Sequence, residues 1–228
     1  MSSILNKHGP RFLLEIAVII IGILLSVLIT NYFEHLKELK KEQIFLRQLQ
    51  QDLHDDLNSL QNDSIVRSEQ YNNVQEMTAY VSGFDQNIST SAMAKGIPSL
   101  LSPIRHTPTD ATFRVLESTG TLSLLQDEDL LRGITRLYAN TYADLAIADQ
   151  NIENFRTSFL LPFALEKFNF MASFKDPEFL PELSVGERVQ LENQMVYASL
   201  SYRTSVAMYE NALAEVRALI EQIEAQLK

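Results

Sequence analysis

The densest run of apolar residues lies near the N-terminus of the chain. Residues 16–29 read I-A-V-I-I-I-G-I-L-L-S-V-L-I, and eleven of these are Leu, Ile or Val. With their apolar neighbours they extend over about 21 residues, which at ~1.5 Å per residue crosses a hydrocarbon core of ~30 Å. A charged helical continuation comes next instead of a small-residue cleavage site, which favours a retained anchor over a cleavable signal peptide or a buried core helix. We predict a tail over residues 1–11 and a transmembrane helix over 12–33.

The apolar residues after the anchor recur at alternating intervals of four and three positions, from Tyr32 to Val81. This heptad seam predicts a stalk helix over 34–82. No proline occurs between Pro10 and Pro98, so we expect the anchor and the stalk to form one continuous helix. Polar residues interrupt the seam at four positions, Gln43, Gln50, Ser64 and Arg67. Interruptions of this kind often set helix register and oligomeric state.

A segment rich in Ser, Thr and Pro comes after the stalk. Gly83 is expected to end the stalk helix, and residues 83–109 are predicted as a loop segment with room for a short helix around 95–102. Loops carry binding residues more often than the faces of a helical bundle do. Arg105 and His106 are therefore the candidates for an external contact surface.

The middle helices are predicted over residues 110–172. A short helix closes at Gly120 as its C′ residue, and a long helix begins with Asp127 as its N-cap. Pro162 is expected to open or kink the helical segment after it. The seam of the long helix is predicted to consist of Leu131, Ile134, Tyr138, Thr141, Leu145, Ala148, Ile152, Phe155 and Phe159.

The C-terminal part holds a connector and one more long helix. Residues 173–184 contain two prolines and are predicted as the connector, and Ser184 with Glu187 forms a capping box for a helix over 185–228. Its seam is Tyr202, Val206, Tyr209, Leu213, Val216, Ile220, Ile223 and Leu227. The predicted fold is all-α, in which the transmembrane helix continues into an antiparallel bundle of three long helices plus short ones over residues 34–228.

Charge and composition exclude several functions. Residues 32–228 carry a net charge of −11, without a basic stripe, which argues against nucleic-acid binding. The chain has no cysteine, which excludes disulfides, thiolate nucleophiles and zinc sites of the Cys type.

One face of the predicted span carries a carboxylate and small residues. Glu15, Gly22, Ser26 and Thr30 lie within about 60° of one direction at 100° per residue. Gly22 and Ser26 form a small-xxx-small pair that lets a second helix approach closely, so this is the candidate association face. In the alternative interpretation, Glu15 reaches the headgroups and pairs with Arg11.

Candidate chemistry in the soluble part is sparse. Asp52, His54, Asp55 and Asp56 look like metal ligands, but His54 points about 160° away from Asp56 on a helix, so a solvated polar face is the preferred interpretation. The sequence contains no zincin motif, phosphate-binding loop, EF-hand or nucleophile elbow. We expect no catalytic residues, no metal site and no cofactor.

Six aromatic residues of the later helices have two interpretations. They could line a ligand pocket between helices, although at seam spacing such residues more often belong to the core. They are Tyr138, Tyr142, Phe155, Phe159, Tyr202 and Tyr209.

The chain resembles an uncharacterised bacterial family of single-pass, membrane-anchored helical proteins known as a domain of unknown function. The residues that carry this resemblance are Glu15, the pair Gly22-Ile23, Asn31, Asp52 with Asp55, and the segment F-R-V-L-E-S-T-G-T-L-S-L-L-Q-D-E-D-L from Phe113 to Leu130. The similarity covers residues 1–60 and, more weakly, 110–140. Tyr32-Phe33 stand where the family pattern suggests a tryptophan. The resemblance implies no activity.

These observations favour a non-enzymatic interaction or scaffold module that assembles through its transmembrane and stalk helices. Its partners would be the lipid bilayer and a second copy or another membrane protein. The alternative is an extracytoplasmic ligand sensor that acts through a partner. We expect a bacterial inner-membrane location. Lys/Arg residues flank the span on both sides, but a short positive N-terminal tail usually stays in the cytoplasm, so we expect the soluble part to be extracytoplasmic.

Overall fold

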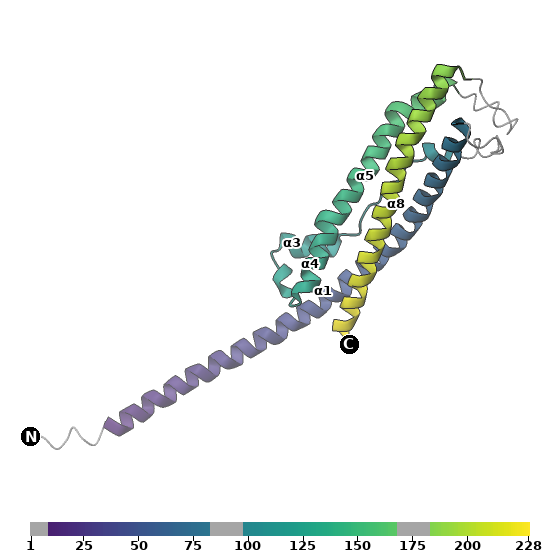
Figure 1. The fold of residues 1–228 in the computed structure, drawn as a ribbon. Coiled ribbons are helices and arrows are strands. Elements are labelled where there is room, and N and C mark those ends of the chain that lie inside the picture. Colours follow the sequence, from purple (N-terminus) through teal and green to yellow (C-terminus); the bar gives the residue numbers. More distant parts are fainter. Residues whose placement is uncertain (1–8, 83–97, 168–182) are drawn as a thin grey trace, which may run out of the picture.

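The computed structural model describes residues 9–82, 98–167 and 183–228 (Figure 1). Every regular element among these residues is helical, and none is a strand. The predicted all-helical class is thus confirmed for the described part of the chain. The predicted helix end at Gly83 and most of the connector 173–184 lie outside the described residues.

Helix α1 spans Gly9–Val81 without a break and projects far beyond the other helices (Figure 1). Its 73 residues correspond to a length of about 110 Å at ~1.5 Å per residue. The continuity of anchor and stalk is confirmed, and the helix begins at Gly9 within the predicted tail. No residue of the most apolar 18-residue window is buried, whereas Leu46 and Leu49 already lie in the core.

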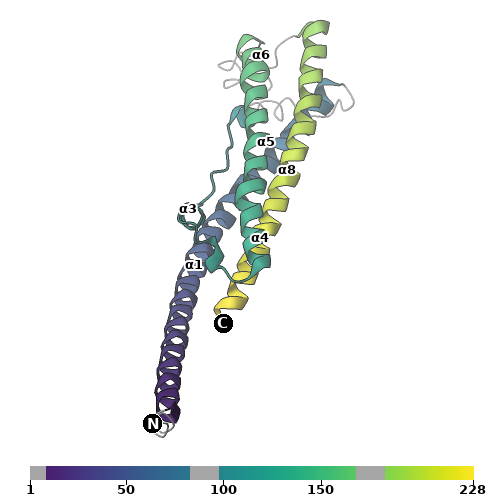
Figure 2. The same ribbon diagram turned by 90° about the vertical axis from the view of Figure 1, so that its left-hand side faces the viewer.

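Helix α8, Val185–Leu227, packs along the second half of α1 (Figures 1 and 2). Gln43 donates to the carbonyl of Gln226, and Gln75 donates to the hydroxyl of Ser199, so the two helices run in opposite directions. The predicted capping box at Ser184 is confirmed, because the side chain and backbone of Ser184 both bond to Glu187.

A third long helical stretch runs from Glu128 to Lys167 and contains two π turns. It consists of α4 (Glu128–Arg136), η2 (Leu137–Thr141), α5 (Tyr142–Phe155), η3 (Arg156–Leu160) and α6 (Leu161–Lys167). Asp127 caps it as predicted, accepting from the amides of Asp129 and Leu130.

The π turns correct the seam predicted for this stretch. Each π turn inserts one extra residue, so the buried positions advance by five, from Leu137 to Tyr142 and from Phe155 to Leu160. Phe159 was expected in the core but is 57% exposed, and Leu160 occupies the core instead. The nearby Pro162 accounts for the second π turn, since it donates no amide hydrogen bond and its ring crowds the preceding turn.

The segment between α1 and α4 includes an extended strap, which we define as residues 102–110. It comes after a helical turn at 98–101 and precedes α3 (Ala111–Ser118) and the 3₁₀ turn η1 (Leu122–Leu124). Gly120 has a φ of +66°, so its predicted C′ role is confirmed.

The described core consists of two apolar clusters separated by a polar layer. The cluster nearer the free end of α1 includes Leu53, Ile134 and Val216, and the distal cluster includes Val74, Ile152 and Met195. Between them lie the buried polar residues Arg67, Gln70, His106, Asp149 and Ser205.

Candidate functional site: a buried polar layer, an open span face and a groove

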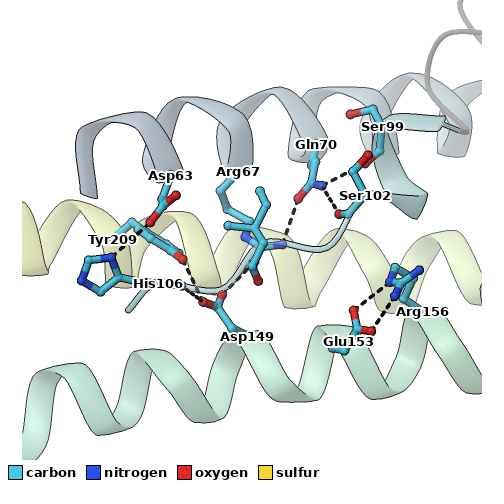
Figure 3. A network of polar contacts seen from close by, with 11 residues as sticks. Asp63, Arg67, Gln70, Ser99, Ser102, His106, Asp149, Glu153, Arg156 and Tyr209 are labelled. Atoms are coloured by element: carbon cyan, nitrogen blue, oxygen red, sulfur yellow. Dashed lines mark hydrogen bonds and ion pairs between the residues drawn. The ribbon is translucent and has the colours of Figure 1, made fainter. Parts of the chain in front are cut away.

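The polar layer centres on an ion pair between α1 and α5. Arg67 Nη2 lies 2.8 Å from Asp149 Oδ1, and the two side chains are 1% and 2% exposed (Figure 3). Arg67 falls on the seam of α1, so the long α1–α8 packing that buries the seam also buries its guanidinium. The guanidinium lies 5.2 Å from the ring centre of Tyr202 on α8, a cation–π contact.

The carboxylate of Asp149 is bonded by three segments of the chain. Its Oδ2 accepts from the hydroxyl of Tyr209 at 2.8 Å and from the backbone amide of His106 at 3.3 Å (Figure 3). Burial raises the pKa of the Tyr209 phenol, and the negative charge of Asp149 raises it further. Tyr209 therefore serves as a neutral hydrogen-bond donor to the buried carboxylate, whereas Arg67 Nε has no hydrogen-bond partner among the described residues.

Side chains of α1 bind the backbone of the strap and of the turn before it. Gln70 accepts from Arg67 and donates to the carbonyls of Ser99 and Ser102, both at 2.9 Å (Figure 3). His106 Nδ1 lies 3.1 Å from Asp63 Oδ2. An extended segment has no ladder partner for its backbone; Gln70 supplies such a partner for the strap at the carbonyl of Ser102, whereas Asp63 contacts the imidazole of His106.

The far end of the strap is held by two carboxylates of α1. Asp56 accepts from the amide of Thr109 at 2.6 Å and from the hydroxyl of Tyr142 at 2.8 Å, and Asp52 accepts from the amide of Thr112 at 2.9 Å. Burial raises the pKa of Asp56 despite the opposing effect of these hydrogen bonds. Tyr142 also has a raised pKa, first because it is buried and then because Asp56 is near.

This arrangement corrects the interpretation of the acidic cluster on the stalk. Asp56 is fully buried and Asp52 is half-buried, whereas a solvated face was predicted for both. Only Asp55 of the four is exposed, and His54 is half-buried. The carboxylates of Asp52 and Asp56 accept hydrogen bonds from backbone amides. In the described part of the chain, no three His, Cys, Asp or Glu side chains are placed to hold a metal ion.

The structure separates the two residues proposed as a contact loop. Arg105 is exposed, but His106 is buried and lies 5.2 Å from the ring centre of Tyr142. The extended backbone of the strap explains the difference, because successive side chains of an extended segment point to opposite sides. His106 therefore belongs to the interior.

The candidate association face of the span is open. Glu15, Gly22, Ser26 and Thr30 are all exposed. The Ser26 hydroxyl donates to the carbonyl of Gly22 at 2.9 Å, so its polarity is satisfied within the helix. A Cβ placed on Gly22 would meet nothing within 4 Å among the described residues.

A groove of about 600 Å³ lies at the distal end, between α5–η3 and α8. Two of the six aromatic residues considered above, Phe155 and Phe159, line it. The other four are buried or half-buried in the core. The complete lining is Asn151, Asn154, Phe155, Ser158, Phe159, Gln190, Asn193, Gln194 and Tyr197.

Sequence reasoning missed Asp63, Gln70 and Asp149 as members of the polar layer. Asp149 did carry a signal, since Leu145, Asp149 and Ile152 have the 4-3 spacing of a seam, and Arg67 supplies the opposite charge on the seam of α1. The sequence carried no signal for the groove, because the groove depends on the π turn that exposes Phe159.

Residues 15–156 of the chain match a family of unknown function (DUF6090). The match includes most of the predicted span, the stalk, the strap and most of the third helical stretch. The predicted resemblance to a family of unknown function is thereby confirmed. No curated protein and no solved structure matches the chain.

Proposed function

Because this chain belongs to the DUF6090 family, whose function is unknown, we propose a role from its own structure: a single-pass, membrane-anchored interaction module without enzymatic activity. In this proposal the helix α1 anchors the chain in a bacterial inner membrane. An antiparallel helical bundle stands on the extracytoplasmic side. The exposed face of the span binds a second copy of the chain or another membrane protein.

The observation that carries this proposal is the division of α1 into an unburied apolar half and a buried half. The span shows no buried residue in its most apolar window, although exposed side chains such as Ile20, Leu24 and Leu28 are large and apolar. Exposing such a surface to water is unfavourable, so a lipid environment would stabilise it. The same helix then forms one wall of the core from Leu46 onward, so the anchor continues directly into the bundle.

The proposed assembly surface is smaller than the sequence suggested, because polar residues of the stalk seam have partners within the bundle. Gln43 and Gln50 bond to Gln226 and Glu224 on α8, and Arg67 pairs with Asp149. These three polar side chains already have partners inside the chain, so they do not support assembly through the stalk. Assembly is therefore assigned to the span, where Gly22 and Ser26 allow close helix approach.

Replacing Gly22 with Leu tests this assignment. Gly22→Leu should disrupt close helix packing and lower the yield of the cross-linked complex in cells, and the complex size in mild detergent should fall with it. The matched control is Ala17→Leu, which also adds a large side chain but lies about 140° away from Gly22 on the helix. The same complex size for wild type and Gly22→Leu would refute assembly through this face.

The partner is identified by mass spectrometry of the cross-linked complex. Recovery of this chain alone at a discrete multiple supports a homo-oligomer. Recovery of a second protein in fixed ratio supports an accessory subunit. Release of the chain from membranes by alkaline carbonate would refute the anchor itself, because an integral helix resists this treatment while peripheral proteins do not.

A second candidate function is a helical-bundle ligand sensor that acts through a partner. The groove between α5–η3 and α8 favours it, since its volume falls within the range of small-molecule sites, about 300–1,000 Å³.

A further inference from the structure

The groove between α5–η3 and α8 owes its aromatic floor to the second π turn. The extra residue in η3 places Leu160 in the core and turns Phe159 outward, where it is 57% exposed. Phe159 stacks on Phe155, with ring centres 6.0 Å apart, and Phe155 lies 4.8 Å from the ring centre of Tyr197 on α8. Three rings from two helices thus form a continuous platform.

The remaining lining of the groove is polar but uncharged. It consists of five side-chain amides and one hydroxyl: Asn151, Asn154, Gln190, Asn193, Gln194 and Ser158. Each amide offers two N–H donors and a carbonyl acceptor. No Asp, Glu, Lys, Arg or His belongs to the lining, although the chain as a whole carries a net charge of −10. The groove is therefore suited to a neutral ligand rich in donors and acceptors.

One lining residue holds an unpaired polar atom. Gln194 is 8% exposed, and its Oε1 has no hydrogen-bond partner among the described residues. A buried acceptor left unpaired destabilises the ligand-free protein. Because this oxygen is itself buried, the Gln194 amide would have to turn toward the groove for a ligand hydroxyl or amide to supply the missing hydrogen bond.

We propose that this groove binds a short neutral saccharide. The C–H face of a sugar ring packs on aromatic rings such as Phe159 and Tyr197, and sugar hydroxyls both donate and accept, as the surrounding amides do. Phosphorylated or acidic ligands are disfavoured because the lining offers them no cation. An extended peptide fits less well: the lining stretch of α8, from Gln190 to Tyr197, is only ~12 Å long at ~1.5 Å per residue, and no charged side chain is present in the lining to hold a peptide terminus.

The test is isothermal titration calorimetry of the full chain in mild detergent with three probes: maltose, cellobiose and di-N-acetylchitobiose. We expect saturable binding of at least one probe, with a Kd in the micromolar to millimolar range. Trialanine serves as the peptide probe. The absence of binding by all three saccharides overturns the proposal, and so does binding of trialanine in preference to them.

The substitution Gln194→Met tests whether Gln194 binds a ligand or has only a structural role. Met is similar in volume and removes the unpaired acceptor, so the ligand-free variant should melt at a higher temperature, while saccharide affinity should fall about three- to tenfold. Gln222→Met is the matched control, since Gln222 is exposed on the same helix but lies about 42 Å away along it. A Gln194→Met variant with unchanged affinity would contradict the assignment.

Asn193→Asp provides a second variant at an exposed position, where folding is not at risk. The carboxylate lacks the two N–H donors of the Asn193 amide, so saccharide affinity should fall by a similar factor, and unchanged affinity would count against the site. Neither variant touches the span, so complex size should stay at the wild-type value. A failure of the groove proposal is therefore distinguishable from a failure of assembly through Gly22.

Discussion

Replacing Arg67 with Met should destabilise the bundle more than a change to any other ion pair of the described residues. Arg67 and Asp149 are 1% and 2% exposed, so the substitution leaves a carboxylate buried with only Tyr209 and His106 as donors. Removing one partner of a buried pair typically costs about 3–5 kcal/mol. Since a domain of this kind has a free energy of unfolding of about 5–15 kcal/mol, the loss is a large fraction of the total.

Urea unfolding of the full chain in detergent, monitored by tyrosine fluorescence, measures this loss. Arg132→Met is the matched control, because Arg132 pairs with Asp129 at the surface, where the side chains are 71% and 81% exposed. An exposed pair contributes about 0–1 kcal/mol, so the control should unfold almost as the wild type does. The double variant Arg67→Met/Asp149→Leu should recover part of the loss, because it leaves no unpaired charge in the interior.

A local measurement shows whether the strap depends on the same pair. Arg67 donates to the carbonyl of Ile104, and Asp149 accepts from the amide of His106, so the two residues hold the backbone on both sides of Arg105. Trypsin should cleave after Arg105 faster in Arg67→Met than in Arg132→Met, as read by mass spectrometry. An unfolding free energy for Arg67→Met within about 1 kcal/mol of the control, or equal cleavage rates, would refute the reasoning.

Two further predictions concern single positions of the bundle. Burial raises the pKa of Asp56, so the folded state favours its protonated form and the wild type loses stability as pH rises through that raised pKa. Asp56→Asn cannot ionise, so its urea midpoint relative to that of the wild type should increase between about pH 3 and pH 7, and a pH-independent difference between the two midpoints would contradict this. Asp56→Ala should lose about 1–3 kcal/mol because it leaves Thr109 and Tyr142 unpaired. Gly120→Ala should lose about 1–2 kcal/mol because φ is +66° there. Gly186→Ala, in the first turn of α8, should gain up to about 0.5 kcal/mol, and equal midpoints for the two variants would contradict the conformational argument.

The features that the sequence predicts well are those that depend on local periodicity and capping. The continuity of α1, the caps at Asp127 and Ser184, and the C′ role of Gly120 can be inferred from spacing and residue type alone. The seam of α8 is buried where it was expected, except for half-buried Val206 and Leu227.

The strap was beyond sequence reasoning because its partners are distant in the chain. Thr109 lies 53 positions from Asp56 and His106 lies 43 positions from Asp149. Nothing in the local pattern of an extended Pro- and Thr-rich segment shows which side chains will accept its amides. The acidic residues of α1 looked solvated for the same reason. The sequence around a carboxylate does not show whether it binds a distant backbone amide or water.

The π turns were also hidden from the pattern. A seam assigned at steps of three and four passes from Phe155 to Phe159, and a step of five to Leu160 fits the apolar sequence equally well. Tertiary packing decides between them, and in the structure Leu160 contributes to the distal cluster. The same choice exposes Phe159 and creates the groove, so the candidate site arises from a local feature that periodicity misassigns.

The polar layer also explains how three nearly periodic seams reach one register. Apolar seams of Leu, Ile and Val repeat every seven residues, and a slip by one heptad, about 10.5 Å, would keep most of their contacts apolar. The pair Arg67–Asp149 does not repeat. A slip would leave both charges buried without partners and would free Tyr209 from its acceptor. The polar layer therefore destabilises the misregistered states more than it stabilises the native one. In this way the layer specifies the alignment of α1, α5 and α8, while the two apolar clusters supply the stability.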